Sequence, residues 1–145
     1  MRKVAIYGIG ANFGGIDVSK NFLHSGVAGV GWDQADAPDL HNYIDSIEKG
    51  DIIYIKSCNF GNDICVKGIG IVTDNASVGT FNIGSKYPIN RGKQIDWLDK
   101  STFVIPKPYG KNNVRSNSVY REFHPDVIKA VSYTHLRAHE TTLHL

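Results

Sequence analysis

The chain has 145 residues, of which 41% are hydrophobic and 21% are charged. This composition can fill one hydrophobic core but not a second, so it argues against both a disordered chain and a multidomain protein. The formal net charge is +2 at pH 7, which is too small to indicate nucleic-acid binding by itself, so any site for a polyanion must come from local patterning.

The N-terminal sequence MRKVAIYGIG is interrupted by glycines and lacks the apolar run of a secretory signal. No stretch of the chain approaches the roughly 20 apolar residues that a membrane span needs. We therefore expect a cytoplasmic location and no membrane partner.

The chain opens with a pattern of strand, loop, helix and strand. KVAIY at residues 3–7 predicts a short apolar strand. The glycine-rich GIGANFGG at residues 8–15 predicts a loop, because glycine costs backbone entropy in a regular element. We expect a helix at residues 17–24 that ends before Gly26, and then a strand at residues 27–32.

The segment ADAPDLHNYIDSIEKG, residues 35–50, has the clearest helix signals in the chain. Pro38 suits the first turn and Gly50 suits the stop. Apolar side chains recur at helical spacing at Leu40, Tyr43, Ile44 and Ile47. We therefore expect a helix that buries one face.

Two strands rich in β-branched and aromatic residues follow, at residues 51–58 and 64–74. The intervening NFGND is typical of a hairpin turn, so the two strands should be antiparallel neighbours. Cys58 and Cys65 flank the turn, and in a cytoplasmic chain we expect two reduced thiols.

The second half of the chain predicts further short strands. Residues 89–98 alternate in character, and residues 102–105 form another strand before Pro106. Residues 106–118 are polar and basic, which is typical of a loop, and residues 119–130 predict one short helix broken at Pro125. Short strands with internal glycines indicate a small, strongly bent sheet or partly closed barrel. The expected bends are Gly29, Gly31, Gly68 and Gly70.

The end of the chain has a foreign character. Residues 131–141 read VSYTHLRAHET, which resembles the translation of a transposase mosaic-end sequencing adapter. We therefore predict a single domain at residues 1–129 and a non-native tail at residues 130–145. The His135 and His139 pair, at the spacing of a helical metal site, is set aside with the tail.

Sequence patterns for catalysis, metals and cofactors are missing. The glycine-rich segment fits neither GxGxxG nor GxxxxGK[ST], although such a loop lets a ligand approach the backbone. Two cysteines without imidazoles at metal spacing make no zinc site, and we find no nucleophile turn with a histidine and an acid. We expect a protein that is not an enzyme and needs no cofactor or metal.

Aromatic and basic residues suggest a binding function. A base in a pocket is held by stacking on rings and by polar groups at its edge, and cations contact the phosphates. Rings at predicted strand ends or in loops are Tyr7, Phe13, Trp32 and Trp97. On the residues alone, a core role for the tryptophans and a solvated surface role for the cations remain open.

Four segments in order, FLHSGVAGVGWD, IEKGDIIYIKS, VKGIGIVTD and INRGKQIDWL, resemble the EVE domain and its relatives in the PUA-like superfamily. The resemblance covers residues 22–98 and implies an α+β fold, a small bent β-barrel with short helices closing its ends. It also implies a module that binds nucleic acid and accepts a flipped, often modified base, beside restriction or other phage-defence enzymes.

The candidate residues follow from this resemblance and from position. The resemblance carries Trp32, Asp33, Lys56, Ser57, Arg91 and Trp97, whereas Asn12 and Phe13 come from the glycine-rich segment. The candidate base pocket comprises Asn12, Phe13, Trp32, Asp33, Ser57 and Trp97. The candidate phosphate contacts are Lys56, Arg91, Lys93, Lys111 and Arg115.

We therefore predict a module that recognises a nucleobase in DNA or RNA, with a nuclease or another defence-system protein as a further partner. The alternatives are a structural or protein-interaction barrel and an enzyme with an unrecognised site. A concave pocket that contains an accessible Trp32 or Phe13 and has lysine or arginine on its rim favours base binding, whereas two buried tryptophans and dispersed cations favour the interaction barrel. An acid with a strongly raised pKa inside a cleft favours the enzyme.

Overall fold

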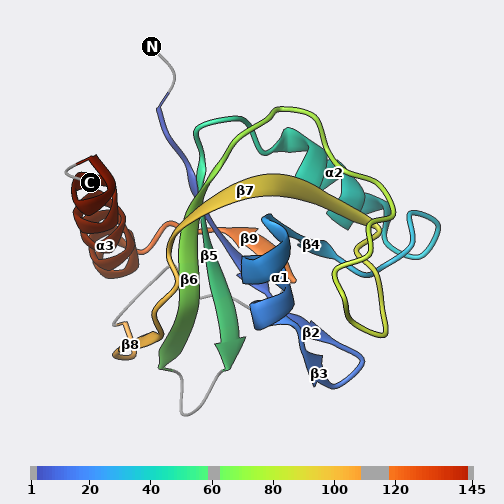
Figure 1. The fold of residues 1–145 in the computed structure, drawn as a ribbon, viewed down its shortest axis with the longest axis horizontal. Coiled ribbons are helices and arrows are strands. Elements are labelled where there is room, and N and C mark those ends of the chain that lie inside the picture. The colour runs from blue at the N-terminus through green and yellow to red at the C-terminus, as the bar shows by residue number, and fades with distance from the viewer. Residues whose placement is uncertain (1–2, 59–62, 109–117, 144–145) are drawn as a thin grey trace.

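The computed structural model describes residues 3–58, 63–108 and 118–143. The chain forms an α+β fold in which a mixed sheet curls into a half-barrel (Figure 1). The strands are β1 (Ile6–Gly10), β2 (Asn12–Phe13), β3 (Ile16–Asp17), β4 (Val27–Val30), β5 (Ile52–Cys58), β6 (Ile64–Val72), β7 (Arg91–Asp99), β8 (Phe103–Ile105) and β9 (Val119–Arg121). The helices are α1 (Ser19–Ser25), α2 (Pro38–Ser46) and α3 (Pro125–Leu143).

The main sheet has the strand order β4-β7-β6-β5-β1-β9, with β8 paired to β6. Strands β1 and β5 are parallel, and the other pairs in this sheet are antiparallel. The predicted hairpin is confirmed, because β5 pairs with β6 and Cys58 faces Cys65 in the register. Strands β2 and β3 form a separate small hairpin after β1.

Helix α2 spans the open side of the curled sheet, since it contacts β4 and β7 at one edge and β9 at the other. The backbone N–H of Arg121 in β9 donates to Tyr43 Oη of α2 over 2.7 Å, and the Tyr43 ring packs edge-on against Tyr7. The buried side chains Ile44 and Ile47 confirm the predicted apolar face. The prediction that short helices close the barrel is therefore confirmed for α2.

Two apolar clusters fill the molecule. The first contains Phe22 of α1, Ile44 of α2 and residues of β1, β4, β5 and β7. The second lies between the sheet and α3, where Val127 and Val131 are fully buried. Among the described residues, no helix is both long enough and apolar enough to cross a membrane.

Two sequence predictions are wrong in this fold. Gly8 and Gly10 were expected in a loop but belong to β1. Position 8 is a glycine because the Tyr120 ring of β9 occupies the space that a side chain there would need. A Cβ on Gly8 would lie 2.6 Å from Tyr120 Cε2, so glycine serves close approach here rather than a bend. The segment after residue 118 forms strand β9, and Pro125 begins α3 instead of breaking a helix.

Helix α3 continues past the predicted domain boundary at residue 130 and includes the buried Val131. The adapter origin of residues 130–145 stays a prediction, because a helical path says nothing about where the sequence came from. The predicted loop at residues 106–118 falls largely on residues 109–117, outside the described residues.

A buried hydroxyl network joins β5 to β9. Tyr54 Oη donates to Glu122 Oε1 over 2.6 Å and lies 2.8 Å from Tyr120 Oη. Burial, together with these two neighbours, raises the pKa of Tyr54 far above its usual range, so its hydroxyl stays protonated.

Tyr54→Phe should lower the free energy of unfolding by about 1–3 kcal/mol, because it leaves a buried carboxylate oxygen and a buried hydroxyl with one partner fewer. Urea denaturation of wild type and variant measures the difference. Tyr87→Phe, at a ring that is 40% exposed, is the matched control and should change stability by no more than about 0.5 kcal/mol. Equal losses in both variants would contradict a special role for the buried network.

Candidate nucleic-acid interface

Trp32 is the exposed ring of the candidate site. It is the second residue after β4, and 55% of its surface is accessible to solvent. Exposure of a large aromatic side chain to water is unfavourable in free energy, so an exposed tryptophan is an informative feature of a protein surface. This ring is open to stacking.

Asn90 holds the backbone before Trp32 and the side chain of Asp33 after it. The Asn90 N–H donates to Val30 O over 2.9 Å, and its Nδ2 donates to Gly31 O over 2.8 Å. The same Nδ2 lies 3.1 Å from Asp33 Oδ1, to which it also donates. The exposed ring therefore stands on a segment with a fixed backbone.

His41 of α2 completes this support from the other side. Its ring is 3% exposed, and Nε2 lies 2.6 Å from Trp32 O. Because a carbonyl oxygen only accepts, Nε2 carries the proton and donates. Sequence reasoning missed both His41 and Asn90 as supporting residues, since each is recognised only by its contact with a main-chain oxygen distant in sequence.

Phe13 was predicted to project from a loop into the pocket, and this is wrong. It lies in β2 with only 9% of its surface exposed, and its ring packs edge-on against Phe22 of α1. Its other neighbour is Gly31, where a Cβ would lie 3.5 Å from Phe13 Cδ2. Phe13 thus forms the apolar base beneath the Trp32 segment rather than a stacking surface.

Asn12, the neighbour of Phe13, is exposed on the β2–β3 hairpin. Its Oδ1 accepts from the Gly15 N–H over 2.9 Å and closes the turn, in which Gly14 and Gly15 have positive φ. The contact between Phe13 and Gly31 brings this hairpin close to the backbone that precedes Trp32, and the place of Asn12 in a base pocket stays a prediction.

Two further exposed rings belong to residues that contact segments next to the Trp32 segment, and sequence reasoning missed them. Tyr87 is 40% exposed, and its ring stands against Gly14 of the hairpin. Phe81 is 38% exposed and exchanges backbone hydrogen bonds of 2.8 and 3.0 Å with Ile89, the residue before Asn90. Both belong to a turn-rich segment, where an aromatic residue has no periodic pattern to reveal its direction. We call Trp32, Phe81 and Tyr87 the aromatic rim.

Trp97 does not belong to the site, which corrects its assignment to the base pocket. It is 7% exposed in the first core cluster, and its Nε1 donates to Phe22 O over 2.9 Å. With its ring buried and its N–H satisfied, this tryptophan ties β7 to α1 and offers nothing to a ligand.

Lys93 was predicted to contact phosphate, and this is also wrong. The residue is fully buried in β7, and its ammonium donates to Asn75 O. Arg91, two residues earlier, is half-buried, and its Nε lies 3.4 Å from Asp45 Oδ1 of α2. Lys93 is therefore not available to a phosphate, whereas Arg91 stays partly exposed and its predicted phosphate contact stays a prediction.

Burial gives Lys93 a testable pH dependence. Desolvation lowers its pKa from 10.5, against the opposing pull of the Asp45 and Asp74 carboxylates. As pH rises toward 10.5, the folded state releases this proton before the unfolded state does, so the free energy of unfolding should rise.

Lys93→Met should remove this rise. We expect the stability of the wild type relative to Lys93→Met to increase in chemical denaturation as pH rises toward 10.5. A flat or falling difference would show that the ammonium is not desolvated as the structure implies.

Four predicted site residues remain. Lys56 and Ser57 belong to β5, near the last residue of β1, and the other two lie outside the described residues. Lys56 faces Gly10 in the β1–β5 register, and its Nζ stands 5.9 Å from the centre of the Tyr120 ring. Ser57 is partly buried, and its hydroxyl has no hydrogen-bond partner in the described part of the chain. Lys111 and Arg115 lie outside the described residues, so their predicted contacts stay predictions.

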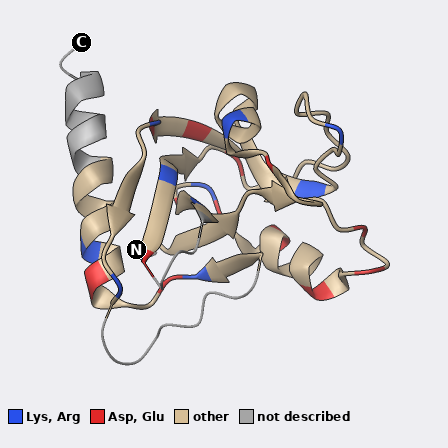
Figure 2. Cartoon of the chain, turned by 90° about the horizontal axis from the view of Figure 1, so that it is seen from below, with Lys and Arg blue, Asp and Glu red and all other residues tan. Residues whose placement is uncertain are grey.

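Charge is mixed over the surface. Lysine and arginine positions are spread over several elements of the chain, with aspartate and glutamate positions among them (Figure 2). Within residues 3–58, 63–108 and 118–143, no group of three or more histidine, cysteine, aspartate or glutamate residues is placed to hold a metal ion. The distinctive feature of the site is therefore its exposed rings.

No known family model matches the chain, and no curated protein matches it. Among solved structures, the fold is similar to that of the YTH domain of the Zygosaccharomyces rouxii MRB1 protein, determined in complex with N6-methyladenosine RNA. The two are 13% identical, the match covers 90% of this chain and 86% of that chain, and the TM-score is 0.53. This similarity shows the fold, and the resemblance to EVE-like domains stays a prediction.

Proposed function

We propose that this chain is a non-catalytic module that binds nucleic acid and recognises a modified base at the aromatic rim. The observation that carries the proposal is the exposed Trp32 ring on a backbone fixed by Asn90 and His41. A ring on a fixed backbone binds a base at a smaller cost in conformational entropy, and stacking on it contributes about 1–3 kcal/mol.

Asp33 supplies the polar half of such a site. Its carboxylate is exposed beside Trp32, and Asn90 Nδ2 orients one of its oxygens. A carboxylate only accepts hydrogen bonds, so it suits the exocyclic N–H of adenine or cytosine. A base methylated on that nitrogen keeps one N–H for Asp33 and gains apolar surface for the rim.

The base must leave its stack to reach such rings, which is easier in a single strand than in a duplex. The structure similar to this chain is that of a domain in complex with N6-methyladenosine RNA, so RNA carrying this base is the first ligand to test. The proposal includes a nuclease or other defence-system partner, which rests on the sequence resemblance alone.

The exposure of Trp32 favours this proposal over a structural or protein-interaction barrel. The mixed surface charge supports a modest phosphate contribution, so most of the selectivity should come from the base. Affinity for unmodified RNA should accordingly be weak at physiological salt.

Fluorescence anisotropy with two short single-stranded RNAs, identical except for one N6-methyladenine, tests the proposal. We expect tighter binding of the methylated strand by about 1 kcal/mol or more, a factor of about five, at every salt concentration. DNA strands of the same sequence decide between the two nucleic acids. Equal affinity for methylated and unmethylated strands, or no binding of either, would exclude the proposed function.

A further inference from the structure

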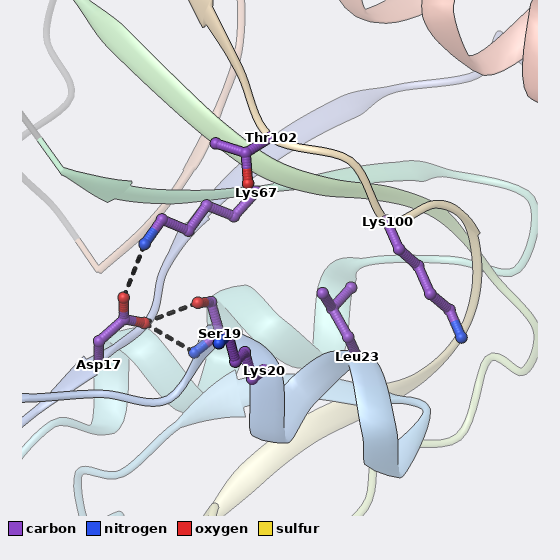
Figure 3. A pocket seen from close by; sticks show the side chains of 7 residues that line it. All are labelled: Asp17, Ser19, Lys20, Leu23, Lys67, Lys100 and Thr102. Atoms are coloured by element: carbon purple, nitrogen blue, oxygen red, sulfur yellow. Dashed lines mark hydrogen bonds and ion pairs between the residues drawn. The ribbon is translucent and has the colours of Figure 1, made fainter.

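A cavity of about 370 Å³ lies apart from the aromatic rim, between α1, β6 and the connection from β7 to β8. It is lined by Asp17, Ser19, Lys20, Leu23, Lys67, Lys100 and Thr102 (Figure 3). Three of the seven lining residues are lysines and one is an acid, so the lining carries two positive charges in excess. None of these residues belongs to the aromatic rim.

The one carboxylate in the cavity is already engaged. Asp17 Oδ2 accepts from Lys67 Nζ over 2.9 Å, and its Oδ1 accepts from the backbone N–H and hydroxyl of Ser19 over 2.9 and 2.7 Å. Burial opposes ionisation, but these hydrogen bonds prevail and hold the pKa of Asp17 below its usual range. Asp17 therefore stays paired with Lys67 and does not neutralise the other lysines.

Lys20 and Lys100 supply the unbalanced charge. Both side chains are exposed, and neither has an ion-pair or hydrogen-bond partner within the described part of the chain. Lys67 and Lys100 extend from opposite sides of the cavity, with Leu23 between them (Figure 3). Two ammonium groups around a hollow with an apolar floor suit a phosphate joined to a sugar.

The cavity is connected to the base site through the β2–β3 hairpin. Asp17, in the cavity wall, pairs with Asn12 in the hairpin register. Phe13 packs between Gly31, beside Trp32, and Phe22 of α1, the helix that carries Lys20. The β2–β3 hairpin thus contacts both the cavity and the segment that carries Trp32.

We propose that Lys20 and Lys100 bind a backbone phosphate of the nucleic-acid strand whose base stacks on Trp32. This inference rests on the proposed function for the identity of the ligand, and it assigns the cavity as the sequence-independent part of the interface. Lys67 positions Asp17 and closes one side of the hollow.

The salt dependence of binding tests this assignment. For a single strand, each phosphate that is neutralised adds about 0.7 to the steepness of log affinity against log salt. Because the two lysines together neutralise one phosphate, the slope of the Lys20→Gln/Lys100→Gln variant should be shallower than that of the wild type by about 0.7, while the preference for the methylated strand is kept.

Lys49→Gln/Lys129→Gln is the matched control, because it removes the same charge from two other lysines whose side chains are exposed. Its slope should equal that of the wild type. Equal slopes for the wild type and the Lys20/Lys100 variant, or equally shallow slopes in both double variants, would overturn the cavity assignment.

The same data keep the two proposals apart. A shallower slope in the Lys20/Lys100 variant, without any preference of the protein for the methylated strand, would support the cavity assignment and refute base recognition. A preference for the methylated strand with an unchanged slope in that variant would refute the cavity assignment alone. A further arm titrates AMP and follows the amide NMR signals of Lys20 and Thr102. Shifts with AMP but not with the RNA would assign the cavity to free nucleotides and contradict the proposal, as would the absence of shifts with both.

Discussion

Replacement of Trp32 by alanine should weaken binding of the methylated strand by about 1–3 kcal/mol, a factor of roughly 5 to 150. The loss should come from the stacked ring, so the unmethylated strand should lose less and the preference should fall toward one. Because the side chain is 55% exposed, the free energy of unfolding should change by only about 0.5 kcal/mol. Anisotropy titrations and urea denaturation of the same preparation measure both effects.

Phe123→Ala is the matched control for this variant. Phe123 is 58% exposed and lies in the connection between β9 and α3, where Arg121 stacks on its ring. Its removal should leave affinity and preference unchanged. If the two alanine variants bind alike, the aromatic rim is not the base site.

Gly29→Ala should lower the free energy of unfolding by about 3 kcal/mol or more. Gly29 of β4 pairs with Gly92 of β7, and a Cβ on Gly29 would lie 2.7 Å from Gly92 Cα. It would be closer still to Arg91 O and to Ile89, and backbone atoms of a paired strand cannot move aside cheaply. Strands β4 and β7 would then be forced apart next to the segment that carries Trp32.

Gly79→Ala provides the comparison, since a Cβ at Gly79 meets no atom within 4 Å. This variant should stay within about 0.5 kcal/mol of the wild type in chemical denaturation. A Gly29→Ala variant as stable as Gly79→Ala would show that β4 and β7 are not packed as closely as the structure has them.

Local signals predicted the parts of the fold that local physics determines. Pro38 at the first turn and the apolar spacing of Ile44 and Ile47 fixed α2, and Gly26 does cap α1 with a positive φ of 69°. The hairpin between β5 and β6 followed from its turn residues and its β-branched strands. These elements needed no information from distant residues.

The errors arose where a distant partner decides the outcome. Gly8 is a strand residue because of Tyr120, which lies more than a hundred positions later in the chain. The sequence placed Lys93 on the same alternating face as Ile95 and Trp97, and the structure buries all three. That alternation argued for a buried lysine, but the charge was interpreted as a sign of solvent exposure.

The candidate site was predictable in its most exposed residue and not in its surroundings. Trp32 stood out because it ends a predicted strand and lies in a segment that resembles EVE-like domains. Tyr87, Asn90 and His41 could not be connected with it, since their contacts depend on how the turn after β6 and helix α2 fold over β4. The periodicity of the sequence does not reveal tertiary contacts of this kind.

The two tryptophans allow a direct test of the central claim, because each contributes one indole N–H signal to a nitrogen-15 NMR spectrum. Trp32→Phe assigns the signals. Titration with the methylated RNA should shift the Trp32 signal strongly and leave the signal of the buried Trp97, bonded to Phe22 O, unchanged. Binding that leaves the Trp32 signal in place, or moves only that of Trp97, would contradict the account.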